Sequence, residues 1–373
     1  MNILILGGTG VMGTMLMKLL IEDKDNHVTI TSRSSRSSEF ENISYIKGDA
    51  KELSFLNEIV AENWDVIVDF MFYRTEEFKQ RYMLFLEHAN QYVFLSSARV
   101  YAFSEVPITE NSPRLLDVSE DKEFLATDDY ALAKARCEDM LNSSGKNNYT
   151  IIRPSITYGD AQLRLGYYEK EQWLYRILKG RSLVFSEDIA NQYTTMTKGS
   201  DVAEGIYSII GKAEALGESF HITCEKAYTW NEILECYLNV LEKKLGKRPK
   251  VIMTKKSTCL NIDKWHVMYC LSYSRRFDNT KIKQFTDVDN FIDPLDGLSQ
   301  CLEVFLENPR FKGCNWKLEA LNDKVAGEHA RLNEIPGKAW KLYYLVYRYG
   351  TVSAGDFCRR ICNAVTRRIH NIC

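Results

Sequence analysis

The sequence lacks the features that define several large classes of protein. It has no apolar run of the roughly 20 residues that a membrane-spanning helix requires. Its first residues lack the charged-then-apolar order of a signal peptide, and it contains no low-complexity linker and no solenoid-type repeat. The 48 Lys and Arg residues nearly balance the 50 Asp and Glu residues, so net charge does not draw the protein to nucleic acid. We therefore expect a globular, cytoplasmic protein that does not bind nucleic acid.

The ten cysteines show no arrangement typical of a metal site or a disulfide framework. They contain no C-x-x-C pair and do not group with histidines at ligand spacing. We interpret them as thiols of a reducing compartment and expect no bound metal. They lie at positions 137, 224, 236, 259, 270, 301, 314, 358, 362 and 373.

The 373 residues suffice for about two domains. In residues 1–160 short apolar runs alternate with amphipathic segments, which predicts a parallel sheet with helices on both faces. We expect an α/β fold with a doubly wound, Rossmann-type sheet over 1–160, to which later segments return. A smaller substrate-binding lobe over 161–310 and a basic, aromatic extension over 311–373 complete the predicted organisation.

Four glycines in "GGTGVMG" lie between the first predicted strand and the first predicted helix. They fit G-x-G-x-x-G when counted from Gly8 and G-x-x-G-x-x-G when counted from Gly7. In this context missing side chains allow a tight turn and bring the backbone and a helix N-terminus close to a pyrophosphate. The loop therefore predicts dinucleotide binding by Gly7, Gly10, Val11, Met12 and Gly13.

The end of the second predicted strand indicates which dinucleotide is bound. An acid that would hold the ribose hydroxyls of NAD is missing, and Ser32 and Arg33 stand there instead. Since an arginine suits a 2′-phosphate, NADP is favoured over NAD. Ligands of a doubly wound sheet bind beyond the carboxyl ends of its strands. Further candidate cofactor ligands therefore follow the third, fourth and fifth strands: Asp49, Ala50, Asp69 and Ser96.

Three residues form a candidate catalytic set. Ser97 ends the fifth predicted strand, and Tyr130 and Lys134 are four residues apart on a helix predicted from Tyr130 to about Asn142. A phenol is a poor base at neutral pH unless a nearby ammonium stabilises its phenolate. Tyr130 would then exchange a proton with a substrate oxygen that Ser97 positions, while hydride moves to or from the cofactor.

These motifs together resemble those of the extended short-chain dehydrogenase/reductases, a family that includes UDP-galactose 4-epimerase. "GGTGVMG" is similar to the family's glycine motif, "SSARVY" to its serine motif and "YALAK" to its Tyr/Lys pair. In "IIRPSITYGD" the resemblance places Arg153 and Pro154 beside the nicotinamide. It covers roughly residues 1–310 and implies an NAD(P)-dependent epimerase or keto-reductase, a nucleotide-sugar substrate and a homodimer.

Some positions depart from the family pattern. Ala98 and Arg99 replace the acidic pair of the 4,6-dehydratases, which disfavours dehydration, and Thr194 stands where epimerases commonly carry a diphosphate-binding arginine. The basic residues that remain as candidates for binding the substrate are Arg99, Arg164, Arg181, Lys198 and Arg276.

An alternative function follows from the segment "DVIVDFMFYR". It is similar to an atypical branch of this family that includes chloroplast stem-loop RNA-binding proteins. This resemblance implies a protein whose fold binds a polymer and whose active site is vestigial. The intact Ser97, Tyr130 and Lys134 and the near-neutral charge argue against this alternative.

The last residues combine basic and apolar character. From position 338 to 373 there are seven Lys or Arg residues and one acid, and the end of the chain has apolar residues at intervals of three and four. Such a helix would lie on an anionic membrane surface, or pack on its own domain or a partner subunit. The apolar positions are Phe357, Ile361, Val365, Ile369 and Ile372.

Overall fold

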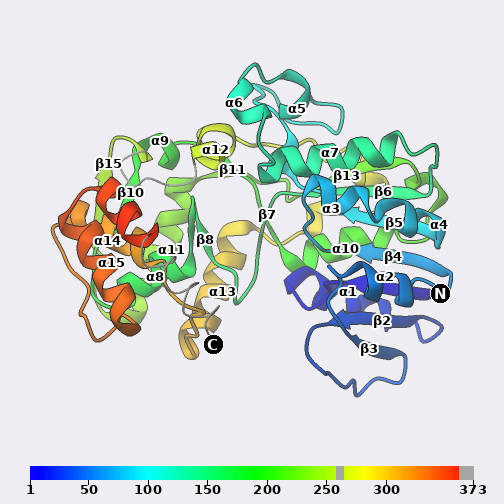
Figure 1. Ribbon diagram of the computed structural model, residues 1–373, viewed down its shortest axis with the longest axis horizontal. Helices are drawn as coiled ribbons and strands as arrows, with labels where there is room; N and C mark the ends of the chain where they lie inside the picture. Colours follow the sequence, from blue (N-terminus) through cyan, green and yellow to red (C-terminus); the bar gives the residue numbers. More distant parts are fainter. Residues whose placement is uncertain (258–263, 361–373) are drawn as a thin grey trace. The chain divides into compact units, whose positions relative to one another are not determined.

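Strand β1 (Asn2–Leu6) lies inside a parallel sheet, and this position explains its unbroken apolar sequence. Residues 3–6 are all fully buried, because helices cover both faces of the sheet. The computed structural model, which describes residues 1–257 and 264–360, thus has the α/β architecture expected from the sequence (Figure 1).

The central sheet has seven strands in the order β13-β6-β5-β4-β1-β2-β3, and each pairs with its neighbours in parallel. β1 pairs with β2 on one side and with β4 on the other, so the strand order reverses there. The prediction of a doubly wound, Rossmann-type sheet is confirmed. The remaining strands are β2 (His27–Ser32), β3 (Ile43–Lys47), β4 (Trp64–Asp69), β5 (Ala89–Leu95), β6 (Tyr149–Pro154) and β13 (Glu218–Ile222).

Two groups of helices cover the two faces of this sheet. Ile3 and Ile5 pack with residues of α1 and α10, whereas Leu4 and Leu6 pack with residues of α2, α3, α4 and α7. Alternate residues of one strand therefore serve two separate cores. The helices are α1 (Val11–Leu20), α2 (Leu53–Ile59), α3 (Thr75–Lys79), α4 (Tyr82–Glu87), α7 (Tyr130–Asn142) and α10 (Gly199–Ile209).

The described residues form two compact units whose boundaries differ from the predicted ones. Unit 1 comprises Met1–Gln162, Tyr193–Tyr228 and Tyr273–Leu298. Two segments assigned above to a lobe over 161–310 thus belong to the sheet unit. They return because β13 extends the sheet beside β6, and because β12 (Met196–Lys198) pairs with β7 (Ile156–Tyr158).

Unit 2 comprises the described parts of Leu163–Gln192, Thr229–Ser272 and Ser299–Cys373. The region 311–360 is part of this unit and not a separate extension. Its α14 (Trp316–Ala326) and α15 (Gly337–Tyr349) share a core of aromatic side chains. The other elements of unit 2 are β8 (Arg164–Leu165), β9 (Tyr168–Glu169), α8 (Lys170–Leu178), β10 (Leu183–Ser186), α9 (Glu187–Ala190), α11 (Trp230–Leu245), β15 (Val251–Thr254) and α12 (Lys264–His266).

Short elements and one longer helix complete the fold. They are α5 (Leu115–Val118), α6 (Lys122–Leu125), β11 (Tyr193–Thr194), β14 (Tyr228–Thr229) and α13 (Pro294–Glu307). Over the two described ranges, no helix combines the length and hydropathy needed to cross a bilayer. The apolar stripe predicted after Phe357 lies at residues 361–372, outside the described residues.

Candidate active site

Close packing explains three of the four glycines in the loop between β1 and α1. Gly7 has a φ of +70°, a conformation that other residues rarely adopt. A Cβ on Gly8 would lie 2.6 Å from Cγ2 of Ile5, and a Cβ on Gly13 would lie 2.5 Å from the backbone of Gly8. Strand, loop and helix approach one another only because these side chains are missing.

Gly10 is different, because no atom lies within 4 Å of the place where its Cβ would be. It is the N-cap of α1, no side chain caps this helix, and the first turn, which begins with Val11 and Met12, has no acidic residue. Open space in front of an uncapped helix N-terminus fits the pyrophosphate of a dinucleotide. The donors here are backbone N–H groups, and the loop therefore fits the predicted cofactor.

We expect Gly10→Ala to weaken dinucleotide binding by roughly tenfold or more, because the new methyl group enters the space proposed for the pyrophosphate. The free energy of unfolding should change by less than about 1 kcal/mol, since that methyl group meets no protein atom. Titration calorimetry with NADPH and NADH, together with urea unfolding, measures both effects. Gly8→Ala is the matched control and should destabilise the fold. An unchanged affinity in Gly10→Ala would contradict this location of the site.

The end of β2 presents basic and hydroxyl groups. Ser32 is buried, and its hydroxyl accepts a hydrogen bond from Nε of Arg36 at 3.3 Å. Arg33 is exposed beside it. After β3, an oxygen of Asp49 accepts the backbone N–H two residues further on, and Ala50 is buried. The first six residues after β2 thus include two arginines and no acid.

Asp69, predicted as a cofactor ligand, forms hydrogen bonds inside the protein instead. Its carboxylate accepts hydrogen bonds from the backbone N–H of Met71 at 2.8 Å and from the hydroxyls of Tyr92 at 2.8 Å and Tyr73 at 3.4 Å. The residue is fully buried, and burial raises the pKa of its carboxyl to about 6. We therefore withdraw Asp69 from the set of cofactor ligands: it shapes the chain after β4.

Tyr130 and Lys134 occupy the first two turns of α7, as the sequence predicts. Lys134 is buried, and its Nζ donates hydrogen bonds to the carbonyl oxygens of Leu95 and, at 3.2 Å, Met71. It also lies 4.5 Å from the centre of the Phe94 ring. Neutral carbonyls hold the ammonium in place without neutralising its charge, so it remains able to stabilise a phenolate one helical turn away.

Ser97 and Arg99 follow β5 in a short helical turn, Ala98–Val100. The Ser97 hydroxyl accepts the N–H of Arg99 at 3.2 Å, which leaves its own proton available to a substrate oxygen. The Arg99 guanidinium lies 5.1 Å from the centre of the Tyr130 ring and 3.6 Å from Asp129, the N-cap of α7. Its buried Nε has no hydrogen-bond partner among the described residues.

Arg153 and Ser96, two further predicted cofactor ligands, both contact Glu138 instead. Nε and Nη2 of Arg153 donate to the two oxygens of this fully buried carboxylate, each at 2.8 Å, and the Ser96 hydroxyl donates at 2.5 Å. Nη1 of Arg153 donates to the Tyr101 hydroxyl at 3.0 Å. Pro154, which ends β6, is buried. The side chains of Arg153 and Ser96 therefore join β5 and β6 to α7, and we no longer propose them as cofactor ligands.

Sequence reasoning missed two residues that shape the site. Glu138 is four residues after Lys134 and eight after Tyr130, so this spacing on one helix face was the signal that could have found it. The second is Phe72, whose ring lies 5.1 Å from that of Tyr130. Phe72 belongs to the segment "DVIVDFMFYR" described above. Nothing in that segment indicates that it contacts α7.

The predicted substrate-binding arginines outside the Ser97 region have different surroundings. Arg276, in unit 1, is exposed and lies 3.9 Å from the centre of the Tyr193 ring. Arg164, in unit 2, forms an ion pair with Glu169.

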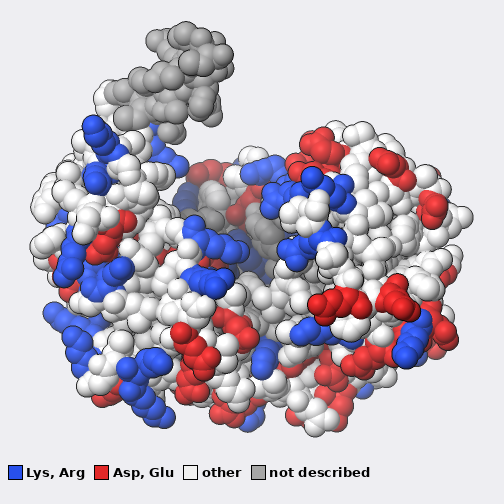
Figure 2. Space-filling view, turned by 90° about the horizontal axis from the view of Figure 1, so that it is seen from below, with Lys and Arg blue, Asp and Glu red and all other residues white. Residues whose placement is uncertain are grey.

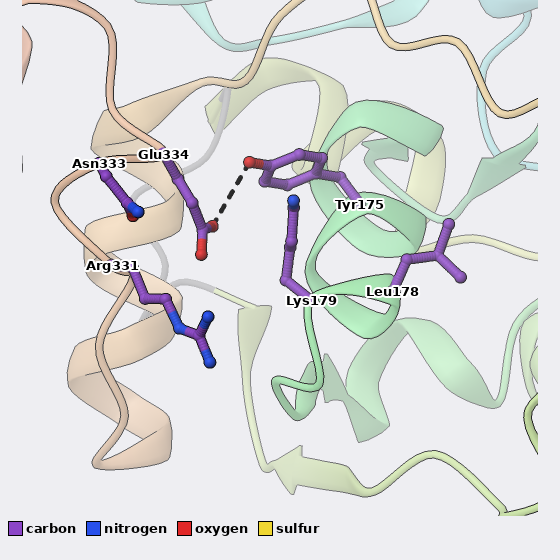
Figure 3. Close-up of a pocket in the computed structure, with 6 residues that line it drawn as sticks. All are labelled: Tyr175, Leu178, Lys179, Arg331, Asn333 and Glu334. Carbon is purple, nitrogen blue, oxygen red and sulfur yellow. Dashed lines mark hydrogen bonds between the residues drawn. The ribbon is translucent and has the colours of Figure 1, made fainter.

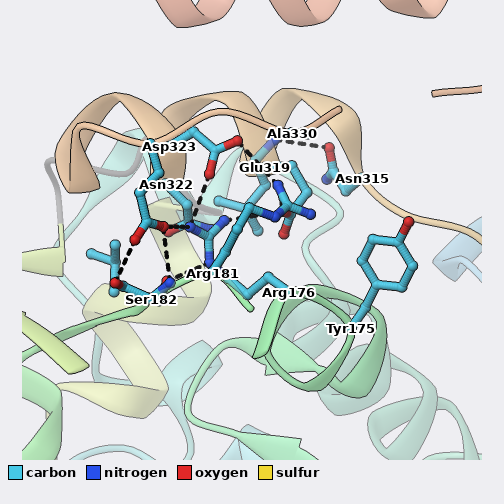
Figure 4. A network of polar contacts seen from close by, with 12 residues as sticks. Tyr175, Arg176, Arg181, Ser182, Asn315, Glu319, Asn322, Asp323 and Ala330 are labelled. Atoms are coloured by element: carbon cyan, nitrogen blue, oxygen red, sulfur yellow. Dashed lines mark hydrogen bonds and ion pairs between the residues drawn. The ribbon is translucent and has the colours of Figure 1, made fainter. Parts of the chain in front are cut away.

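Arg181 is part of a buried ionic network in unit 2 (Figure 4). Its Nη1 lies 2.9 Å from Glu319 and 3.1 Å from Asp323, and the side chain is buried. Its charge is therefore offset by carboxylates of α14, and the structure gives it a role in joining α14 to the segment before β10. We withdraw it as a substrate ligand for this reason.

A polar pocket lies on unit 2, and sequence reasoning did not anticipate it (Figure 3). The Tyr175 hydroxyl donates to Glu334 across it at 3.4 Å. Its other lining residues are Leu178, Lys179, Arg331 and Asn333. The pocket contains no candidate nucleophile next to a base, and we assign it no chemistry. The described residues also contain no group of three or more His, Cys, Asp or Glu side chains suited to a metal ion.

Comparison with solved structures shows the same fold in nucleotide-sugar enzymes. A UDP-N-acetylglucosamine 4-epimerase from Methanobrevibacter ruminantium, in complex with UDP-N-acetylmuramic acid, superimposes with a TM-score of 0.63 at 19% identity, over 82% of this chain and 98% of that one. A UDP-glucuronic acid 4-epimerase from Bacillus cereus, in complex with UDP-glucuronic acid and NAD, gives 0.59 at 17% identity, over 82% and 99%. A dTDP-glucose 4,6-dehydratase from Bacillus anthracis, in complex with NAD, gives 0.63 at 18% identity, over 83% and 97%.

Sequence comparison identifies the family. The chain is 28% identical over 247 residues to the chloroplast stem-loop binding protein of 41 kDa b from Arabidopsis thaliana, an alignment that covers 62% of this chain. The chain thus spans about 60% of the length of that relative. The model of the NAD dependent epimerase/dehydratase family matches residues 3–222, more than half of the chain. The expected family and fold class are therefore confirmed, and this chain belongs to the NAD dependent epimerase/dehydratase family.

Proposed function

We propose that this protein is an NAD(P)-dependent epimerase or keto-reductase that acts on a nucleotide-activated sugar. The observation that carries the proposal is the environment of Lys134, which is buried, held by two carbonyl oxygens and one turn from Tyr130. Burying an ammonium costs free energy, which the two carbonyl hydrogen bonds offset in part, and the charge held at this position can stabilise a phenolate. Ser97 stands at the end of the adjacent β5.

Each member of the catalytic set has a defined task. When bound, the nicotinamide supplies the hydride acceptor or donor. Tyr130 takes the proton from the sugar hydroxyl as it is oxidised and returns a proton when the carbonyl is reduced. Lys134 stabilises the phenolate that Tyr130 carries before it takes the proton and again after it returns one, and Ser97 donates a hydrogen bond to the reacting oxygen.

We propose Arg99 as the main substrate-binding residue, because of its position and its unpaired nitrogen. It lies between the Tyr130 ring and the region of Ser97, and its buried Nε is unpaired among the described residues. A guanidinium so placed suits an anionic or oxygen-rich group of the substrate. The solved relatives that bind UDP-sugars support this substrate class. Arg276, exposed in unit 1, remains a candidate for the diphosphate, and a homodimer remains a proposal that rests on the resemblance.

We further propose NADP as the preferred cofactor. Arg33 and Arg36 follow β2, and the position expected to carry an acid for NAD holds Ser32. An acid there would repel a 2′-phosphate, whereas arginines attract it. Two of the solved relatives are in complex with NAD, so the preference for NADP rests on these residues of the chain itself.

The decisive experiment identifies the small molecules that leave the purified protein on denaturation, by mass spectrometry, and then tests turnover. We expect NADP(H) to be released. With UDP-sugars and dTDP-sugars, an epimerase should form the isomer without consuming added NADPH, and a reductase should consume one NADPH per product. Recovery of NAD(H) alone, together with tighter binding of NADH than of NADPH, would contradict the cofactor preference. Failure to bind either dinucleotide would overturn the proposed function.

Nucleic-acid binding is a second candidate function, because the curated relative is a stem-loop binding protein. The near-neutral charge of this chain weighs against it, since affinity for nucleic acid comes largely from neutralised phosphates. In this candidate Tyr130 has no chemical role, so the Tyr130 substitution analysed in the Discussion separates the two functions.

A further inference from the structure

Helix α15 has two apolar faces, of which only one is covered. Tyr343, Tyr344 and Tyr347 are buried and pack with Trp316 of α14 in the core of unit 2. This inward face gives the helix the contact that a stable domain needs. The apolar residues on its other side have no such packing.

The outward face carries Leu342, Leu345 and Tyr349, whose exposed fractions are 49%, 36% and 68%. Their spacing of three and four residues places them in one stripe along the helix. Trp340 and Phe357 are also exposed. Single exposed apolar residues are ordinary, but a stripe of neighbouring ones that ends on an exposed tyrosine is typical of an interaction surface.

Basic residues accompany this stripe. Lys338 belongs to the same stripe by its helical spacing, Lys341 and Arg348 lie along one flank of it, and Arg359 and Arg360 follow the helix in exposed positions. Figure 2 shows Lys and Arg side chains spread over the left-hand part of the molecule, which is unit 2, with fewer Asp and Glu side chains between them.

Acids near the stripe are too few to offset this charge: residues 338–360 contain five Lys or Arg residues and one acid, Asp356, which already pairs with a lysine of α14. Asp356 accepts hydrogen bonds from Lys317 at 2.8 Å and from the Tyr347 hydroxyl at 2.7 Å. Glu334 lies 3.8 Å from Arg181 and accepts from Tyr175. The surface around the stripe therefore keeps a net positive charge.

We infer that this face of α15 docks on the surface of an anionic lipid bilayer. Leucine and aromatic side chains insert at the boundary between headgroups and acyl chains, and lysines and arginines contact the anionic headgroups. A second copy of the chain fits the face less well. In a symmetric dimer the same basic residues would meet each other across the contact. The inference is independent of the proposed chemistry, since it concerns residues of unit 2 only.

Vesicle flotation of the full chain tests this inference. We expect binding to phosphatidylcholine vesicles that contain about 30% phosphatidylglycerol, and little binding to pure phosphatidylcholine. The triple variant Leu342→Gln/Leu345→Gln/Tyr349→Gln should lose roughly tenfold or more in partitioning. Lys338→Gln/Lys341→Gln should lose roughly fivefold for each lysine, and salt should weaken the wild-type binding.

Matched controls change residues of the same kind elsewhere. Val106, Val118 and Val304 are exposed apolar residues, and their joint replacement by Gln should leave flotation unchanged. Lys243→Gln/Lys244→Gln on α11 should have a much smaller effect than the lysine pair of α15. Equal flotation of the α15 variants and the controls would overturn the inference. A wild-type dimer that the triple variant converts to a monomer in light scattering would also overturn it, in favour of a second copy.

Discussion

Replacing Tyr130 by phenylalanine is expected to lower turnover by roughly a thousandfold, within the range that general acid–base catalysis contributes. The substitution removes one oxygen atom and keeps the ring that contacts Phe72 and Arg99. The fold and the affinity for the dinucleotide should therefore persist. Steady-state kinetics with the sugar nucleotide found by the copurification experiment gives kcat, and titration calorimetry gives the affinity for the cofactor.

Tyr207→Phe on α10 is the matched control, because Tyr207 is exposed and has no place in the catalytic set. Its kcat should equal that of the wild type. Full kcat in Tyr130→Phe would show that the phenol transfers no proton and would contradict its catalytic role. The binding function would be favoured if the wild type turned over no sugar nucleotide and Tyr130→Phe bound stem-loop RNA as the wild type does. A loss of cofactor affinity equal to the loss of kcat would instead mean that Tyr130 acts in binding.

Local signals explain which parts of the site could be predicted from the sequence. The helix from Tyr130 to Asn142 was expected in these bounds, since Asp129 caps it and its apolar residues recur at helical spacing. The glycine loop was equally visible, because its turn, its backbone approach and its helix N-terminus each require a missing side chain. Both features depend on residues that are close together in the chain.

The contacts that the sequence did not predict join residues that are distant in the chain. Asp69, Ser96 and Arg153 were expected at the ends of their strands and are there, but their side chains turn to partners elsewhere. Glu138 lies 42 residues after Ser96, and nothing in either segment alone announces their contact. The sequence predicted that later segments return to the sheet, but it did not identify residues 193–228 as one of them, because β13 reaches β6 only through long-range pairing.

The partners of Arg181 also lie far away in the chain and could not be predicted from the sequence. The same ionic network contains the residue whose replacement should lower stability most. That residue, Arg176, is fully buried, and the Nη atoms of Arg176 donate at 3.0 Å to Glu319 and at 3.0 Å to Asp323 (Figure 4). Its Nε donates to the carbonyl of Ser182 at 2.6 Å. One guanidinium thus holds two carboxylates of α14 against α8.

Arg176→Leu should lower the free energy of unfolding of unit 2 by about 3–5 kcal/mol, because it leaves buried carboxylates with one cation too few. Urea unfolding followed by tryptophan fluorescence measures it, since Trp173, Trp230 and Trp316 are buried in this unit. Arg248→Leu is the control, as Arg248 pairs with Glu235 and Glu242 in a largely exposed position. That change should cost less than about 1 kcal/mol.

The origin of this loss can be tested separately from its size. If the penalty lies in uncompensated charge, Glu319→Gln should restore part of the stability when it is added to Arg176→Leu, because one buried carboxylate fewer is then left for Arg181, which still pairs with Asp323 at 3.1 Å. If the penalty lies in lost packing of the long Arg176 side chain, the second substitution should lower stability further. A double variant less stable than Arg176→Leu would therefore contradict the electrostatic explanation. It would show that the network stabilises unit 2 mainly through the packing of its side chains.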